Sequence, residues 1–528
     1  MNSPYIPNYD FLELTSEKIL LAAKVLLGQG GVDTVMESRK GWITAPKKSG
    51  RKLSEWSELV KSLLLQPTKT QYVIGMGGSA LGAYALIKNP FIEHQVETIF
   101  LGSNHPGFIE QIEAKIDFPS SMFLICSKSG TTKETLSLFK YFFNRCIAQL
   151  GENEARRRFV SVTDPGSPLQ TLSEDRKIFV VYSDANMGGR FSVLSSLSII
   201  PALFSGGDLT GIIYGAEHAM DKCIAAHSYE EIPARVSFLL NCLKNGRDKV
   251  YIFVPPSLQP FGLWLVQLLA ESLGKNGLGF IPVLRCLDSY KCVELYNDQC
   301  CLIIKHTAGD MQKDSGADKD SSKYNPNMMD IYIYDSNALG EEFYYWQYSV
   351  ALIGLVMGVN PFDQPDVELS KKAFEKMALG KDLDIPIYEV PSKKVIKGII
   401  EKVEFGKYVV ILIYTNPSGK YKEVLESIRC KLESLCGVPV ILDFGPGYLH
   451  STGQLYKGGP RSGVFIQIVE EGYARKAIPT ELAELNDEMV LQAESDYDEL
   501  TSLGRFVHRM SVPFDRLEMV RNLVTEMD

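Results

Sequence analysis

A regular alternation of short apolar runs with longer helical stretches begins near residue 71, and this pattern restricts the fold more than any other feature. The first series of apolar runs, rich in β-branched and aromatic residues, lies at 72–75, 96–102, 122–127, 158–164 and 178–183. A second series lies at 250–256, 301–307, 330–335, 408–415 and 464–469. Strands that alternate with helices predict mostly parallel sheets with helices on both faces. The expected fold class is therefore α/β.

The two series divide the 528 residues into two α/β domains with a helical segment at each end. We expect the domains at 51–220 and 221–478, which is a reasonable size for large α/β units. Residues 1–50 show helical patterning followed by lysine-rich loops, and are predicted to form an N-terminal helical arm. Residues 479–528 are predicted to form a C-terminal helical tail.

Composition excludes several classes of function. The 55 basic and 64 acidic residues give a net charge of −9, which disfavours non-specific nucleic-acid binding. No run reaches the ~18 apolar residues of a membrane span, and the N-terminus lacks the pattern of a signal peptide. The ten cysteines show no C-x-x-C spacing and no two histidines have metal-ligand spacing. We expect a cytoplasmic protein with no metal and no nucleic-acid or membrane partner.

Two loops that directly follow strands of the first series contain the residues of an anion site. Gly78 and Ser79 lie in the glycine-rich run 75–82, and the first six residues of the run 127–135 carry four hydroxyls and a lysine before a helix. Ligands of open parallel sheets bind beyond the carboxyl ends of the strands, and helix N-termini favour phosphate. We therefore predict a phosphate site that includes Ser127, Lys128, Ser129 and Thr132. A tight turn and a Ser/Thr-rich cap, with Thr131 and Glu134 at capping-box spacing, are the alternatives.

Other candidates for chemistry lie further along the chain. Arg190 follows a glycine pair, which indicates either a cation near a ligand or a surface ion pair. Gln267 and Glu271 share one face of an apolar helix at i, i+4 spacing, where a solvated helix end is the alternative. Gln364 and Lys371 are seven residues apart in a loop that turns into a helix, although a single lysine is most often solvated.

Histidines offer two candidates. His450 lies in a loop of small and polar residues, and His306, which follows an apolar run, is the reserve.

Taken together, these motifs resemble those of the phosphoglucose isomerase family. The matching runs are GMGGSALG at 75–82, SKSGTTKET at 127–135, NMGGRFS at 186–192, QLLAESLGK at 267–275, NPFDQPDVELSKK at 360–372 and LHSTGQ at 449–454. The first two are general to sugar-isomerase domains, while the arginine, glutamate and F-D-Q-P runs are specific to the isomerase. The resemblance implies two sugar-isomerase domains, a sugar-phosphate substrate, no cofactor and a homodimer.

The resemblance also implies a role for each candidate residue. The reaction is the interconversion of glucose 6-phosphate and fructose 6-phosphate through a cis-enediol, in glycolysis and gluconeogenesis. Glu271 would move the proton between C1 and C2, and Arg190 would stabilise the charge that develops on the sugar oxygen. His450 and Lys371 would open the sugar ring. Substrate would be held by Gln267 and Gln364 and, at its phosphate, by Gly78, Ser79, Ser127, Lys128, Ser129 and Thr132.

The order of the motifs departs from the common family pattern, because the histidine run here follows F-D-Q-P instead of preceding it. Gly130 also replaces a bulkier residue that many members carry. The order resembles that of the isomerase part of transaldolase–isomerase fusion proteins. The runs LHSTGQLYKGGP and GRFVHR support that subgroup.

Three alternative functions are compatible with the same motifs. A non-enzymatic sugar-phosphate sensor would need the phosphate loops but not Glu271, Arg190 and Lys371 together. A dual isomerase would also accept mannose 6-phosphate. The isomerase half of an aminosugar synthase would normally come with an amidotransferase domain, of which this sequence has no sign.

Overall fold

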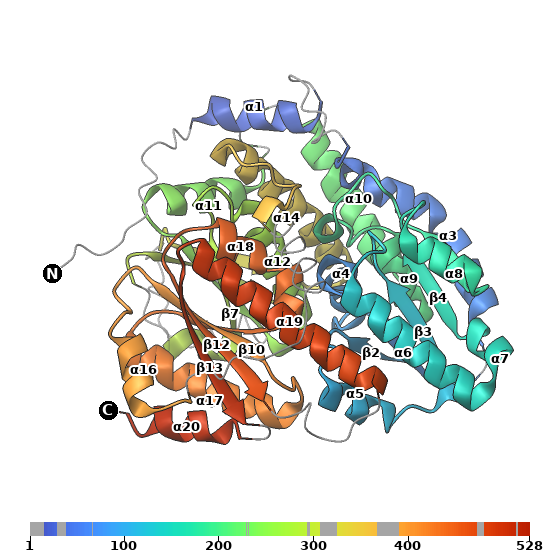
Figure 1. Ribbon diagram of the computed structural model, residues 1–528. Coiled ribbons are helices and arrows are strands. Elements are labelled where there is room, and N and C mark those ends of the chain that lie inside the picture. Colours follow the sequence, from blue (N-terminus) through green and yellow to red (C-terminus); the bar gives the residue numbers. More distant parts are fainter. Residues whose placement is uncertain are drawn as a thin grey trace.

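The computed structural model of this chain describes residues 15–28, 38–65, 67–226, 228, 230, 232–292, 296–306, 325–366, 390–471, 480–513 and 516–527. These residues form three parallel sheets, each flanked by helices (Figure 1). The sheets follow one another along the chain, within 70–182, 249–332 and 408–513. The predicted α/β class is confirmed.

The first sheet has the strand order β2-β1-β3-β4-β5. Its strands are β1 (Thr70–Ile74), β2 (Glu97–Leu101), β3 (Ser121–Cys126), β4 (Phe159–Thr163) and β5 (Phe179–Tyr182). The helices of this part are α1 (Ser16–Leu26), α3 (Ala45–Leu63), α4 (Leu81–Ile87), α5 (Pro106–Glu113), α6 (Lys133–Leu150), α7 (Glu152–Arg157), α8 (Pro168–Asp175), α9 (Ser196–Phe204) and α10 (Thr210–Ala225). Short 3₁₀ turns are η1 (Gly41–Thr44), η2 (Gly77–Ser79), η3 (Phe118–Ser120) and η4 (Gly189–Phe191).

Side chains of β3 are buried on both faces, as expected for a central strand of a covered parallel sheet. On one face the Phe123 ring stacks between Tyr72 and Phe159, with ring centroids 5.1 and 4.6 Å away, and α6 packs over this cluster. On the other face Leu124 packs in a cluster with residues of α9. The period-2 alternation of the apolar runs therefore produces two cores, one on each face.

The second and third sheets have the orders β7-β6-β8-β9 and β11-β10-β12-β13. Their strands are β6 (Lys249–Val254), β7 (Ile281–Cys286), β8 (Gln299–Lys305), β9 (Met328–Tyr332), β10 (Tyr408–Tyr414), β11 (Val440–Phe444), β12 (Gly463–Glu471) and β13 (Phe506–Pro513). Their helices are α11 (Ala234–Lys244), α12 (Gln259–Leu273), α14 (Ser336–Met357), α16 (Lys393–Ile400), α17 (Gly419–Cys436), α18 (Gly453–Gly458), α19 (Thr480–Ser502) and α20 (Glu518–Thr525). The 3₁₀ turns are η6 (Pro256–Leu258), η7 (Leu287–Cys292) and η8 (Gly447–His450).

One hydrophobic cluster joins the second sheet to the third. It contains Tyr251 and Phe253 of β6 together with Tyr408, Leu412 and Tyr414 of β10. The opposite face of the third sheet is covered by α16, α17 and α20. Helix α19 contacts the third sheet and also α5 and α6, so it connects this sheet to the first part of the chain (Figure 1).

The segment boundaries differ in detail from those expected. The boundary at 50/51 falls inside α3, and that at 220/221 falls inside α10, while that at 478/479 lies outside the described residues. The expected second domain holds strands of two sheets. The tail is not purely helical, because β13 pairs in parallel with β12 along its whole length. Alternating apolar residues of β13, Met510 and Val512, complete the core of the third sheet.

Within the described residues, no helix is both long and apolar enough to cross a membrane.

Candidate active site

The carboxyl edge of the first sheet brings the two predicted phosphate loops together, because β1 and β3 are neighbours. The chain leaves β1 toward β2 on one side and leaves β3 toward β4 on the other, so a crevice forms where the direction changes. Ser79 Oγ accepts a hydrogen bond from the Lys128 backbone N–H at 3.2 Å, and Ser127 Oγ lies 3.3 Å from Thr132 Oγ1. We call residues 75–79 and 127–132 the cradle.

Helix α6 begins directly after the cradle. Its N-cap is Thr132, whose side chain makes no capping hydrogen bond. The alternative of a capping box formed by Thr131 and Glu134 is therefore excluded, because the N-cap is Thr132 and the Glu134 carboxylate binds His450. The exposed hydroxyls of Ser129 and Thr131 lie 2.9 Å apart at this helix N-terminus. Hydroxyls and first-turn N–H groups at such an end favour an anion.

The Lys128 ammonium is bound by Asp164. Its Nζ lies 2.6 and 2.7 Å from the two Asp164 carboxylate oxygens and 2.7 Å from the Asp184 carbonyl oxygen. Burial lowers the pKa of Lys128, and Asp164 partly opposes that shift. The structure thus brings the backbone of Lys128 to the cradle, whereas its charge is largely neutralised by Asp164.

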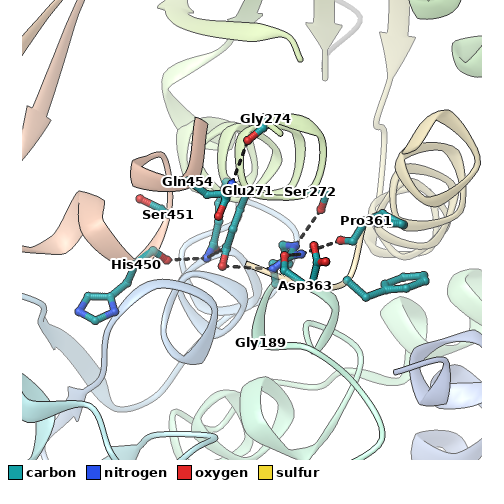
Figure 2. Close-up of polar contacts among 12 residues, drawn as sticks. Gly189, Glu271, Ser272, Gly274, Pro361, Asp363, His450, Ser451 and Gln454 are labelled. Atoms are coloured by element: carbon teal, nitrogen blue, oxygen red, sulfur yellow. Dashed lines mark hydrogen bonds and ion pairs between the residues drawn. The ribbon is translucent and has the colours of Figure 1, made fainter. Parts of the chain in front are cut away.

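Arg190 forms a buried ion pair with Glu271, which is labelled in Figure 2. The pair lies next to the cradle, because the Arg190 backbone N–H lies against Gly78. Arg190 Nη1 lies 3.2 Å from Glu271 Oε1, and the two side chains are 0% and 5% exposed. Arg190 Nε donates to Ser272 Oγ at 2.8 Å, and Nη2 donates to the carbonyl oxygens of Pro361 and Asp363 at 2.6 and 3.0 Å. The burial of both side chains therefore excludes a surface ion pair for Arg190 and a solvated helix end for Glu271.

The surroundings of Glu271 suit a carboxylate that exchanges protons. Burial raises its pKa above the ordinary 4.5, and this effect exceeds the opposing influence of Arg190 and of the hydrogen bond from Gln267. Gln267 Nε2 donates to Glu271 Oε2 at 2.8 Å. The i, i+4 spacing on α12 thus places both side chains in one site, as expected.

His450 reaches the site from the third sheet, in η8 after β11. Its carbonyl oxygen accepts a hydrogen bond from Gln267 at 3.0 Å, but its ring lies on the side away from Glu271 (Figure 2). The ring Nε2 lies 2.8 Å from Glu134 Oε1, which also accepts from Gln492 of α19. Burial would raise the pKa of Glu134, but the charge and hydrogen bond of His450, together with hydrogen bonds from a backbone N–H and from Gln492, lower the pKa to about 2.

Two glycines allow loops to meet: Gly77 meets a loop of the third sheet, and Gly78 meets another loop of the first sheet. A Cβ on Gly77, where φ is +50°, would lie 2.1 Å from the His450 carbonyl oxygen. A Cβ on Gly78 would lie 2.4 Å from the carbonyl carbon of Gly189. Any larger residue would collide with backbone, so the cradle, the Arg190 loop and the His450 loop fit together only with glycine here.

Three further candidates have different outcomes. Gln364 is half-buried and directly follows Asp363, whose carbonyl binds Arg190. Lys371 lies outside the described residues. The His306 ring packs edge-on against Phe91, at 5.6 Å between centroids. Among the described residues, no group of three or more His, Cys, Asp or Glu side chains could hold a metal ion.

The sequence did not predict the partners of these candidates. His450 binds Glu134, which in turn accepts from Gln492, and Arg190 donates to Ser272 and to the carbonyl of Asp363. Ser272 and Asp363 lie inside matched motifs, so their position was a usable signal. Gln492 lies in a helix that gives no such indication.

Comparisons with known proteins agree with this arrangement. A family model described as phosphoglucose isomerase matches residues 57–277, a range that holds the cradle, Arg190 and Glu271 but ends before His450. A glucose-6-phosphate isomerase of Acholeplasma laidlawii is 30% identical in an alignment that covers 58% of this chain and 82% of that protein. A probable glucose-6-phosphate isomerase of Methanococcus maripaludis is 27% identical over 63% of this chain and 82% of that protein.

Solved structures show the same fold. A hypothetical protein from Thermus thermophilus aligns with a TM-score of 0.59 at 26% identity, over 69% of this chain and 95% of that one. A glucose-6-phosphate isomerase from Chlamydia trachomatis aligns with a TM-score of 0.53 at 18% identity, over 68% of this chain and 77% of that one.

Proposed function

The chain belongs to the phosphoglucose isomerase family, and from this premise we propose that it interconverts glucose 6-phosphate and fructose 6-phosphate through a cis-enediol. The observation that carries the proposal is the buried Glu271–Arg190 pair at the rim of the cradle. A protein that only sensed a sugar phosphate would have no need for a buried carboxylate and cation beside its anion site. The reaction would serve glycolysis and gluconeogenesis.

Proton transfer is the step assigned to Glu271. Its carboxylate would remove the proton at C2 of the aldose and return it to C1, because a cis-enediol presents both carbons to one base. Negative charge would grow on the sugar oxygen in the enediolate. The Arg190 guanidinium is held by Ser272 and two backbone carbonyls, so it would stabilise that charge without first having to rearrange.

Substrate binding is assigned to the cradle and the glutamines. The hydroxyls of Ser79, Ser127, Ser129 and Thr132 and the N-terminus of α6 would bind the phosphate, with the backbone of Gly78 and Lys128. Binding energy at this remote group would position C1 and C2 at the base. Gln267 and Gln364 would orient the sugar.

Ring opening is assigned to His450, with Lys371 as the second group implied by the family resemblance. Glu134 carries a negative charge at all ordinary pH values, because its pKa is about 2. A carboxylate at 2.8 Å from Nε2 favours the protonated ring, which is the form able to give a proton to the ring oxygen.

Replacing His450 by alanine is expected to slow turnover of the cyclic substrate by about 10²-fold, within the usual range for an acid–base group. The open-chain form needs no ring opening, so its turnover should fall much less. Rapid-mixing assays that compare freshly dissolved cyclic anomers with a non-cyclising substrate analogue measure the difference. Equal losses for both would assign ring opening to another group, with His306 as the first to test.

The pH profile should report the raised pKa of Glu271. The base works only when ionised, so kcat/KM should fall as pH drops through that pKa, above the 4.5 of an ordinary glutamate. Initial rates between pH 4 and 8 measure this limb. A rate that stays flat to below pH 4.5 would contradict the assignment.

The proposed reaction is tested by following fructose 6-phosphate formation from glucose 6-phosphate in a coupled assay, with mannose 6-phosphate as a second substrate. Exchange of the C2 hydrogen with solvent should accompany turnover. The absence of product from glucose 6-phosphate would refute the proposal, while turnover of both sugars would establish a dual isomerase. The family resemblance further supports a homodimer, whose mass light scattering would measure, and a cytoplasmic location, which microscopy of a fluorescently tagged chain would test.

A further inference from the structure

Lys275 is a buried cation that the proposed chemistry does not use. It lies just after α12 and is 2% exposed. Its Nζ donates to the Ser272 carbonyl oxygen at 3.0 Å and to the Asn360 carbonyl oxygen at 2.5 Å, and pairs with Asp363 Oδ1 at 3.0 Å. A buried ammonium is costly unless such partners compensate it, so its placement needs an explanation.

The explanation is in the turn of residues 360–363, which lies between Lys275 and Arg190. Lys275 binds the turn at both ends, through the Asn360 carbonyl and the Asp363 carboxylate. Two other carbonyls of the same turn, those of Pro361 and Asp363, accept from Arg190 Nη2. The turn is therefore a bridge between two cations.

The remaining contacts leave Lys275 as the polar group that fixes this turn to α12. Inside the turn, Asn360 Oδ1 accepts from the Phe362 N–H at 2.9 Å. The Phe362 ring packs on Trp42 and Phe191, which are on other segments of the chain. Those contacts hold the apolar side of the turn and the plane of the Pro361–Phe362 peptide, whereas Lys275 binds the two ends of the turn, at the Asn360 carbonyl and the Asp363 carboxylate.

We propose that Lys275 is a positioning residue, which fixes the 360–363 turn so that its carbonyls hold the Arg190 guanidinium against Glu271. The proposal rests on the proposed isomerase function and deepens it. Ser272 takes part on both sides, since its hydroxyl binds Arg190 and its carbonyl binds Lys275. The short run from Glu271 to Lys275 thus contains the proposed base, and also Ser272 and Lys275, which hold Arg190 directly and through the turn.

The charges that face Lys275 make its hold on the 360–363 turn dependent on pH. Arg190, Asp363 and Glu271 surround its ammonium; burial first, and then Arg190, lower its pKa to about 7 against the opposing carboxylates. Above that pH the ammonium loses its proton and its ion pair with Asp363. Wild-type kcat should therefore decline as pH rises through about 7, and this decline should vanish when Lys275 is replaced.

The test compares two ion pairs of similar geometry. In one, Lys275 and Asp363 are 3.0 Å apart and 3% and 39% exposed; in the other, Lys305 and Asp330 are 3.1 Å apart and 12% and 39% exposed.

Asp363→Ala keeps the backbone carbonyl that binds Arg190 and should lower kcat about 10-fold with KM changed less than about threefold. Lys275→Met should lower kcat about 10²-fold, as expected for a misplaced catalytic group. Asp330→Ala should stay within about twofold of wild type.

The outcomes separate this inference from the function on which it rests. The measurements are kcat and KM on glucose 6-phosphate, the pH profile and the melting temperature of each variant. If Lys275→Met does not fold, Asp363→Ala still tests the positioning role, because the Asp363 side chain is the more exposed partner of the ion pair. Wild-type activity with an unchanged kcat in Asp363→Ala would overturn the positioning role alone, as would a loss confined to KM. A wild-type protein with no isomerase activity would overturn both.

Discussion

Glu271→Gln is expected to lower kcat for the isomerisation about 10³- to 10⁴-fold, while the sugar phosphate still binds. The amide has the size of the carboxylate and can still accept the hydrogen bond from Gln267, but it cannot take a proton from C2. The phosphate site is unaffected because the cradle lies on other segments. The coupled assay measures turnover, calorimetry measures binding, and hydrogen exchange at C2 measures the proton step itself.

The chain offers a matched control in Glu342. This carboxylate is also buried, pairs with Arg235 at 2.7 Å, and has a pKa raised first by burial. Glu342→Gln should therefore lower the free energy of unfolding about as much as Glu271→Gln does. Its kcat should stay within about twofold of wild type. Near-wild-type turnover in Glu271→Gln would remove this residue from the role of base.

Arg190→Lys is expected to produce the second-largest loss, about 10²- to 10³-fold in kcat with little change in KM, as when a preorganised charge stabiliser is removed. Lysine keeps the charge, but one ammonium cannot bind Glu271, Ser272 and two carbonyls at once. The site keeps its net charge, so folding is less at risk than with a neutral residue. The loss falls on kcat because charge on the sugar oxygen develops only after substrate has bound.

Arg235→Lys is the corresponding control, since it retains charge beside Glu342 at a site far from the cradle along the chain. Its melting temperature should be similar to that of Arg190→Lys, and its kcat should be close to that of the wild type. A rise in KM without loss of kcat in Arg190→Lys would make Arg190 a ground-state binding group and contradict its proposed role at the enediolate.

The fold class followed from the alternation of strands and helices, but the division into sheets did not. Apolar periodicity identifies a strand without identifying its neighbour in the sheet. The runs at 330–335 and 408–415 look alike in sequence, yet β9 belongs to the second sheet and β10 to the third. Likewise β13 was missed in the tail because a helical pattern precedes it.

For the site, local patterns predicted which residues gather but not which atoms they use. The Thr131–Glu134 spacing suggested a helix cap, whereas the partner of Glu134 is His450, 316 positions away. Lys128 was expected to add charge to the cradle, but its ammonium is bound by Asp164. Both differences come from long-range ion pairs, which sequence spacing does not encode.

The meeting of loops at Gly77 and Gly78 also brings together motifs that lie far apart in the sequence. The cradle and the Arg190 loop leave the first sheet, Glu271 lies on a helix between two strands of the second, and His450 follows a strand of the third. The contacts among these residues depend on where the segments lie in space, and not on their order along the sequence. The junction therefore depends on small residues at these two positions, because a side chain at either one would push apart loops that come from distant parts of the sequence.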